Sequence, residues 1–169
     1  MKMKNGKINL AIISTGGRAR YVVDNLLRDS ARQVQIVAVY DAIPKNIPDA
    51  LKLWQAQDAV CYDSVEGAIH HPGVDWVMIF SPNAFHKEAI LAGFRAGKHV
   101  FAEKPLATTI DDCVEIHRAQ QECGKLFMTG FVLRYAPAYR QAKAIFDSGE
   151  LGRILAINAD ENIYSGHGG

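Results

Sequence analysis

Residues 8–41 constrain the fold more than any other part of this sequence. They open with an apolar run, 8–13, which stops abruptly at Ser14-Thr15-Gly16-Gly17. An amphipathic segment follows with apolar residues at helical spacing, and a second apolar run, 36–40, ends in Asp41. This order predicts a strand, a glycine turn, a helix, a second strand and an acid at its end.

A unit of this kind has the chemistry to bind a dinucleotide. Glycines in the turn let the backbone approach a pyrophosphate, and the next helix presents free N–H groups and its positive dipole end. The candidate pyrophosphate contacts are Ser14, Thr15, Gly16, Gly17 and Arg18. An acid at the end of the second strand can accept hydrogen bonds from both ribose hydroxyls and would repel a 2′-phosphate. The terminal acid therefore predicts NAD as the cofactor, in preference to NADP.

The turn departs from the usual G-x-G-x-x-G fingerprint at its first position. Ser14, Gly16 and Ala19 occupy the three glycine places, so the middle glycine is kept and alanine stands where the pattern tolerates it. An ordinary glycine turn remains an alternative interpretation. Arg18 and Arg20 have two interpretations as well, because they can lie beside a phosphate or be solvated residues in the first turns of a helix.

Composition narrows the class of protein. The chain has 169 residues and a formal net charge of +1, which suits one soluble domain, or one domain and the start of another. This balance offers no bulk charge for nucleic acid or an anionic membrane. Three scattered cysteines without a C-x-x-C predict neither a disulfide framework nor a metal site. No apolar run approaches the roughly 20 residues of a membrane span. We expect a cytoplasmic protein with no nucleic-acid or membrane partner.

The rest of the chain alternates between strand and helix patterns. Strands are predicted at 59–62, 74–80, 99–102, 125–129 and 153–160. Helices are predicted at 49–57, at a brief segment capped by Asp63 with Glu66, at 85–96, at a segment capped by Thr109 with Asp112, and at 137–148. Such alternation implies right-handed crossovers and a doubly wound parallel sheet, a Rossmann-like α/β fold.

Polar residues follow four of the predicted strands directly. They are the 14–17 turn, Asp41, the Ser81-Pro82-Asn83 segment and the Glu103-Lys104-Pro105 segment. Ligands of doubly wound sheets bind at the carboxyl ends of the strands, near the switch in strand order. Packing alone does not require this accumulation, so we expect these segments to form one site.

Several of these segments resemble motifs of the glucose-fructose oxidoreductase, inositol dehydrogenase and rhizopine catabolism family, known as Gfo/Idh/MocA. The resemblance covers about residues 8–160. It is carried by SPNAFHKEA (81–89), AGKHVFAEKPLA (96–107), GFVLRYAPAY (130–139) and SGELGRI (148–154). The first resembles a T-P-N-x-x-H motif with Ser81 in place of threonine, and the third has Val132 where the family has asparagine.

The resemblance implies a role for the segment that contains Lys104. This residue matches the family's active-site lysine, which lies near the nicotinamide and the substrate hydroxyl and assists proton transfer or orientation. Glu103 is implied to orient the loop or to touch the cofactor. The Lys104-Pro105 bond is cis in many family members, so a cis bond is expected here. The alternative for Lys104 is a solvated loop cation.

Other implied positions line the cofactor cleft or the cleft between domains. Ser81, Pro82, Asn83 and His86 match the former, and Arg134 with Tyr135 matches the latter. Without that role, Asn83 would cap a helix and His86 would be an exposed first-turn residue. Because Val132 cannot form the hydrogen bonds of asparagine, it puts the neighbouring Arg134 assignment in doubt.

The function implied by the resemblance is an NAD-dependent oxidoreductase. It would transfer hydride between nicotinamide and a CH–OH carbon of a sugar, inositol or related polyol. Residues 1–130 would form the NAD(P)-binding domain. Residues 131–169 would form the linking helix and first strand of a truncated substrate and oligomerisation domain. On this interpretation the full-length protein is a homo-oligomer, and the 169-residue chain alone is inactive.

Two alternatives stay open at this point. Some relatives in the wider superfamily hydrolyse glycosides with tightly held NAD, through transient oxidation. The chain could also be a noncatalytic nucleotide-binding module that keeps the fold.

Overall fold

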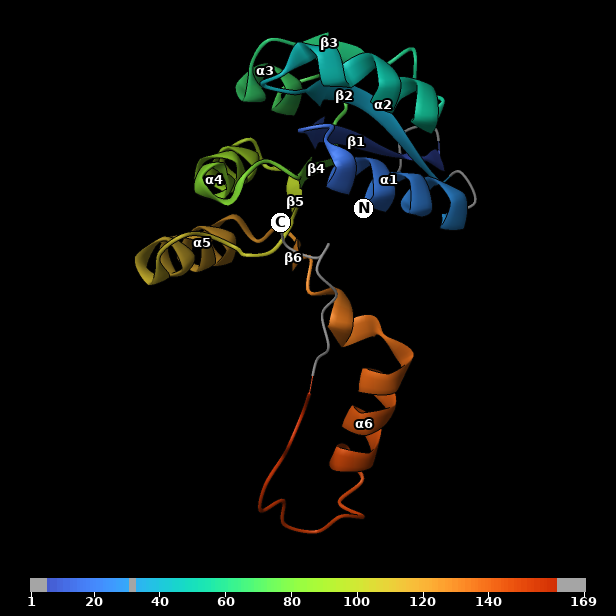
Figure 1. Cartoon of the computed structure of the whole chain (residues 1–169). Helices are drawn as coiled ribbons and strands as arrows, with labels where there is room; N and C mark the ends of the chain where they lie inside the picture. The colour runs from blue at the N-terminus through green and yellow to red at the C-terminus, as the bar shows by residue number, and fades with distance from the viewer. Residues whose placement is uncertain (1–5, 31–32, 161–169) are drawn as a thin grey trace. The chain divides into compact units, whose positions relative to one another are not determined.

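The computed structural model describes residues 6–30 and 33–160 (Figure 1). The chain divides into two compact units, Met1–Gly130 and Phe131–Gly169. The strands of the first unit are β1 (Ile8–Ile13), β2 (Val34–Tyr40), β3 (Val60–Tyr62), β4 (Trp76–Ile79), β5 (His99–Ala102) and β6 (Phe127–Thr129). Its helices are α1 (Gly17–Asp29), α2 (Ile47–Trp54), α3 (Val65–Ile69), α4 (His86–Arg95) and α5 (Ile110–Cys123), with 3-10 turns η2 (Pro44–Asn46) and η3 (Asn83–Phe85). No helix in the described part of the chain could cross a membrane.

The six strands form one sheet in the order β3-β2-β1-β4-β5-β6. Every neighbouring pair is parallel. The chain winds outward from β1 through β2 to β3, then crosses to the other side of β1 and winds outward again from β4. The strand order therefore switches between β1 and β4, which confirms the doubly wound Rossmann-like sheet predicted from the sequence.

The sheet carries a hydrophobic core on each face. Leu10 and Ile12 of β1 pack in the core that α1 and α2 cover. Ala11 and Ile13 pack in the core under α3, α4 and α5. Figure 1 shows these two groups of helices on opposite sides of the sheet. Burial of both faces explains why β1 is continuously apolar from Leu10 to Ile13, with no polar alternation.

The predicted local signals at α5 are confirmed. The Thr109 hydroxyl accepts a hydrogen bond from the Asp112 N–H at 3.1 Å, which caps the amino end. Gly124 closes the other end with a left-handed φ of +61°, a conformation that costs glycine little. The strands predicted at 59–62, 74–80, 99–102 and 125–129 are present as β3, β4, β5 and β6.

Two helix starts differ from the prediction. Helix α2 begins at Ile47, two residues before the predicted start, because Pro48 stands in its first turn. Proline is tolerated there, since first-turn N–H groups have no partner within the helix. Helix α3 is capped by Ser64, which accepts from the Gly67 N–H, and not by Asp63 as predicted.

The second unit contains η4 (Val132–Tyr135) and α6 (Pro137–Asp147), the latter close to its predicted bounds. The strand predicted at 153–160 is wrong, because 154–160 have no regular structure. A strand exists through hydrogen bonds to a neighbouring strand, and none of the described residues pairs with this segment. Leu155 and Ile157, the apolar residues on which the predicted strand was based, are exposed.

Candidate functional site

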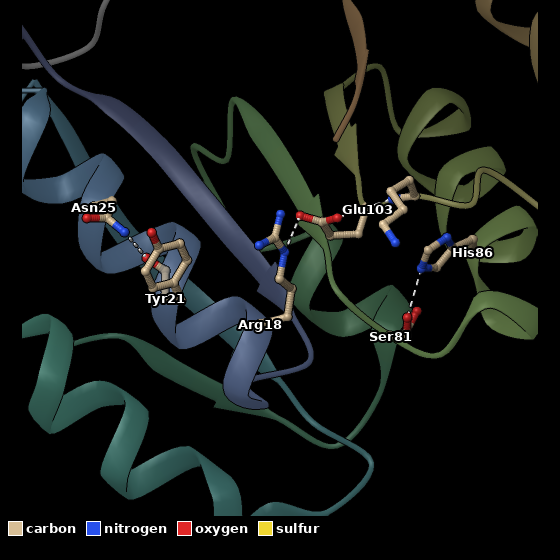
Figure 2. Close-up of polar contacts among 7 residues, drawn as sticks. Arg18, Tyr21, Asn25, Ser81, His86 and Glu103 are labelled. Carbon is tan, nitrogen blue, oxygen red and sulfur yellow. Dashed lines mark hydrogen bonds and ion pairs between the residues drawn. The ribbon is translucent and has the colours of Figure 1, made fainter. Parts of the chain in front are cut away.

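The polar segments singled out in the sequence come together at the carboxyl edge of the sheet. The 14–17 turn follows β1, Asp41 follows β2, Ser81 lies just beyond β4, and Glu103 follows β5. Since β1 and β4 are neighbours at the switch in strand order, this edge is where a doubly wound sheet binds its ligand. Figure 2 shows Arg18, Ser81, His86 and Glu103 in this region.

The turn after β1 leaves space next to its glycines. A Cβ atom built on Gly16 or Gly17 would meet nothing within 4 Å. Gly16 is the residue that precedes α1, no side chain caps this helix, and its first turn contains no acid. Such a helix start presents free N–H groups and a positive dipole end, the two features that bind a phosphate.

Ser14 has a left-handed backbone, with φ at +73°. Ser14 stands where the fingerprint has its first glycine, and its backbone has the left-handed conformation that glycine would adopt there. A non-glycine residue pays roughly 1–2 kcal/mol for this conformation. The chain therefore tolerates strain at the point where β1 runs into the phosphate-type turn.

Asp41 is buried at this edge, with 5% of its surface exposed. Its Oδ2 accepts hydrogen bonds from the Thr15 N–H at 2.6 Å and the Thr15 hydroxyl at 2.8 Å, and its Oδ1 accepts from the Ile43 N–H at 2.8 Å. Burial alone raises the pKa of Asp41, but these hydrogen bonds outweigh it and lower the pKa below the ordinary value. The residue is therefore an ionised carboxylate that joins the turns after β1 and β2.

Arg20 joins the same two turns. Its Nε donates to the Thr15 carbonyl at 3.1 Å and its Nη2 donates to the Asn46 carbonyl at 3.0 Å. Neither sequence interpretation of Arg20 anticipated this, since both placed it beside a phosphate or in solvent. The guanidinium instead supports the backbone on both sides of Asp41.

Arg18 pairs with Glu103 across the edge (Figure 2). The Arg18 Nε lies 2.7 Å from the Glu103 Oε1, and the two side chains are 42% and 8% exposed. Glu103 also accepts from the Lys104 N–H at 3.3 Å. A Cβ on Gly130 would lie 2.9 Å from the Glu103 carboxyl carbon, so this glycine permits the close approach. Sequence reasoning missed the pair, although opposite charges after two strands of one edge were a signal for it.

His86, expected to line the cofactor cleft, lies in the interior with 0% exposed. Its Nε2 contacts the Ser81 carbonyl at 2.7 Å and its Nδ1 contacts the Pro105 carbonyl at 2.8 Å. The ring thus touches protein on both sides, and the alternative of an exposed first-turn histidine is wrong. The Ser81 hydroxyl beside it is a buried polar atom without a hydrogen-bond partner among the described residues.

The remaining predicted residues are exposed. Asn83 opens η3, and no side chain caps either η3 or α4, so the capping alternative for Asn83 is wrong. Lys104 and Pro105 are exposed after β5, and the bond between them is cis, as expected. Arg134 belongs to the second unit, where its guanidinium carbon lies 5.5 Å from the centre of the Phe131 ring.

A hollow of about 910 Å³ lies elsewhere. It is lined by Lys7, Arg28 and Gln35 among others, near the amino ends of β1 and β2. None of the predicted site residues lines it. This hollow and the candidate binding groups therefore lie at opposite edges of the sheet. The uncapped start of α1 and the ionised Asp41 favour the carboxyl edge as the binding site.

Comparison with known proteins agrees with this geometry. A family model described as "Oxidoreductase family, NAD-binding Rossmann fold" matches residues 8–131. Inositol 2-dehydrogenase from Gluconacetobacter diazotrophicus is 35% identical over 153 residues, which are 90% of this chain and 45% of that protein. An Escherichia coli 2,7-anhydro-N-acetylneuraminate hydratase is 30% identical over 136 residues, 80% of this chain and 34% of that protein.

Solved structures give the same result. Myo-inositol dehydrogenase from Lactobacillus casei, in complex with NAD(H) and myo-inositol, matches with a TM-score of 0.79 and 26% identity. The match covers 86% of this chain and 43% of that one. The chain thus spans less than half the length of these relatives. With a family model that matches most of its length, it belongs to the Gfo/Idh/MocA oxidoreductase family, which has an NAD-binding Rossmann fold.

Proposed function

We propose that this chain is the NAD-binding part of a dehydrogenase that transfers hydride between nicotinamide and a CH–OH carbon of an inositol, sugar or related polyol. The observation that carries the proposal is the uncapped start of α1 beside the ionised Asp41 at the switch in strand order. The inositol dehydrogenase relatives supply the substrate class.

The residues present fit a dinucleotide. Open space at Gly16 and Gly17 leaves room for a pyrophosphate against the start of α1. A carboxylate offers roughly four lone-pair directions, and Thr15 and Ile43 occupy three of those on Asp41. We therefore assign Asp41 at most one hydrogen bond from the adenosine ribose, not the pair expected from the sequence. Its negative charge opposes the 2′-phosphate of NADP.

We assign the substrate side of the reaction to Lys104. The lysine on the turn after β5 is exposed. As an ammonium it can donate hydrogen bonds, or a proton, to an alcohol oxygen, and as the neutral amine it can take a proton from the alcohol. The bound nicotinamide supplies the hydride chemistry itself. Glu103 is assigned to hold the lysine turn through its pair with Arg18.

The wider setting of the proposal comes from the longer relatives. We infer that residues 131–169 begin a second domain that holds the substrate, and that the complete protein is a homo-oligomer. We place the enzyme in the cytoplasm because Cys61, Cys113 and Cys123 are all free.

A second candidate is a reaction with no net oxidation. The relative named as a hydratase favours it, because that name describes addition or loss of water. A dehydrogenase accumulates NADH when its alcohol substrate is supplied, whereas a hydratase does not. Absorbance of the reduced nicotinamide therefore separates the two candidates in a preparation that turns over substrate.

Calorimetric titration with NAD and with NADP tests the proposal on this chain. We expect saturable NAD binding, weaker NADP binding, and an affinity for NAD at least about tenfold lower in Asp41→Asn, the cost of one charge-assisted hydrogen bond. Asp58→Asn, an exposed position, is the matched control and keeps the wild-type affinity. A folded chain that binds neither nucleotide would overturn the proposal.

A further inference from the structure

The buried side chain of His86 contacts two turns of the carboxyl edge. His86 is the first residue of α4 and is fully buried. Its Nε2 lies 2.7 Å from the Ser81 carbonyl oxygen, and its Nδ1 lies 2.8 Å from the Pro105 carbonyl oxygen. Figure 2 shows the His86 ring pointing toward Ser81. One side chain therefore touches both the turn after β4 and the turn after β5.

The two contacts differ from those of a solvated histidine in that both partners are carbonyl oxygens. A carbonyl oxygen only accepts hydrogen bonds, so a ring nitrogen holds it only where that nitrogen carries hydrogen. A buried imidazole that loses its hydrogen-bond partner raises the free energy of the folded state. The ring consequently favours one arrangement of the two turns.

That arrangement holds the backbone on both sides of Lys104. Pro105 follows Lys104 directly and is held by the ring. Glu103 precedes Lys104 directly and is held by Arg18, and it also accepts from the Lys104 N–H. The lysine side chain projects into solvent from a turn whose two flanking residues are fixed from different elements.

We propose that His86 is a positioning residue that holds Lys104 at the cofactor edge through the Pro105 carbonyl. The proposal rests on the function proposed above, since it takes Lys104 as the group that faces nicotinamide and substrate. His86 itself touches neither. Its part is to keep the lysine turn in one conformation before any ligand binds.

The test measures hydrogen exchange at the Lys104 amide in three variants of the full chain. His86→Leu removes both ring nitrogens, His86→Gln keeps two N–H donors on one nitrogen, and His117→Leu changes an exposed histidine of α5 as the control. In His86→Leu we expect exchange at Lys104 to rise about fivefold, the factor for one net hydrogen bond. We expect β1 amides to keep their rates, and His86→Gln to restore most of the protection.

Unchanged exchange at Lys104 in a folded His86→Leu chain would overturn the proposal, and so would a His86→Gln chain that behaves like His86→Leu. If the leucine variant does not fold, the nitrogen NMR spectrum of the wild-type ring decides. Hydrogen on the His86 Nδ1, which faces the Pro105 carbonyl, supports the proposal, and a bare Nδ1 contradicts it.

Acetylation of Lys104 separates this proposal from the function on which it rests. NAD should slow the acetylation of Lys104 in the wild-type chain and leave Lys143, an exposed lysine of α6, unaffected. If NAD gives no protection, the assignment of Lys104 to the cofactor edge fails. The exchange measurements need no cofactor, so they still decide whether His86 holds the turn.

Discussion

The two edges of the sheet differ in how their polar groups are satisfied. At the amino edge, Asn9 donates to the Gly73 carbonyl at 2.8 Å and accepts from the Gln35 amide at 2.6 Å. Its N–H donates to Asp75. At the carboxyl edge, the start of α1 has no cap and the Ser81 hydroxyl is buried without a partner among the described residues. The polar groups around Asn9 are therefore satisfied by the protein, whereas the carboxyl edge keeps groups available for a ligand.

The comparison of the two edges shows that unpaired polar groups, and not open volume, indicate a ligand-binding site. The 910 Å³ hollow lies toward the amino edge, where the side chains of Asn9 and Gln35 already have protein partners. Binding free energy comes from groups that gain a partner, and open volume alone supplies none. Open space combined with free donors occurs at Gly16 and Gly17.

The largest effect on stability is expected at the amino edge. Asn9→Leu leaves the Gly73 carbonyl and the Gln35 amide without partners, which should lower the free energy of unfolding by about 3 kcal/mol. NAD affinity should stay unchanged. Urea unfolding and calorimetry measure the two quantities. Asn25→Leu removes an exposed hydrogen bond to Tyr21 and serves as the control. Loss of NAD binding by a folded Asn9→Leu chain would break the comparison.

The opposite pattern is expected at the carboxyl edge. Gly16 has a φ of −66° and no atom within 4 Å of an added Cβ, so Gly16→Ala should leave stability within about 0.5 kcal/mol. The methyl group would occupy the space proposed for the pyrophosphate, and NAD affinity should fall about tenfold or more. The same two measurements apply. An alanine variant that binds NAD as tightly as the wild type would argue against a phosphate at this turn.

The two edges should also respond to pH in different ranges. Burial, and then the charge of Lys125, lower the pKa of His99, whose Nδ1 accepts from the Leu126 N–H at 3.0 Å. His99 therefore binds a proton more readily in the unfolded chain than in the folded one. The contribution of His99 to the free energy of unfolding is fully present above pH 6.5, the ordinary pKa of histidine. It is lost as the pH falls from there through the lowered pKa of the folded chain. Asp41 also has a lowered pKa, so it too stabilises the fold less at low pH, but its contribution begins to fall only below pH 3.8.

Urea unfolding at about pH 7.5 and about pH 5 isolates the histidine contribution, because Asp41 stays ionised over that range. His99→Gln should reduce the difference between the two pH values by about 1 kcal/mol, the worth of one hydrogen bond. His117→Gln, at an exposed site, should not change it. An equal pH difference in all three chains would contradict the assignment to His99.

The smallest effect is expected at Ser14. Its left-handed φ of +73° favours glycine, so Ser14→Gly should raise the free energy of unfolding by about 0.5–1 kcal/mol. Ser30, at the other end of α1, has a φ of −77°, and Ser30→Gly should lower stability by a few tenths of a kcal/mol. Thermal unfolding of both variants measures the contrast. A stability loss in Ser14→Gly would mean that the serine side chain contributes more than its backbone costs.

What the sequence predicted depends on local patterns. The apolar run of β1, the Thr109 cap and the Gly124 stop act over a few neighbouring residues, so their structures could be predicted from the chain alone. The strand at 153–160 could not, because an alternating pattern forms a strand only beside a partner.

The gathering of the candidate segments at one edge of the sheet could be predicted from the sequence, but the contacts between their side chains could not. Strand ends at one edge located the 14–17 turn and Asp41. The Arg18–Glu103 pair spans 85 residues, and His86 contacts the turn after β5, which is 19 residues away in the sequence. These contacts follow from the order of strands in the sheet, which no single segment encodes. Asp41 was assigned to the cofactor, whereas three of its hydrogen bonds serve the protein.

Amide chemical shifts recorded during an NAD titration test the central claim most directly. The two edges carry separate reporters, Gly16 and Gly17 at one and Gln35 and Arg28 at the other. We expect the amides of Gly16 and Gly17 to shift and saturate, while those of Gln35 and Arg28 stay in place. Saturable shifts confined to Gln35 and Arg28 would place the nucleotide at the amino-edge hollow and contradict this account.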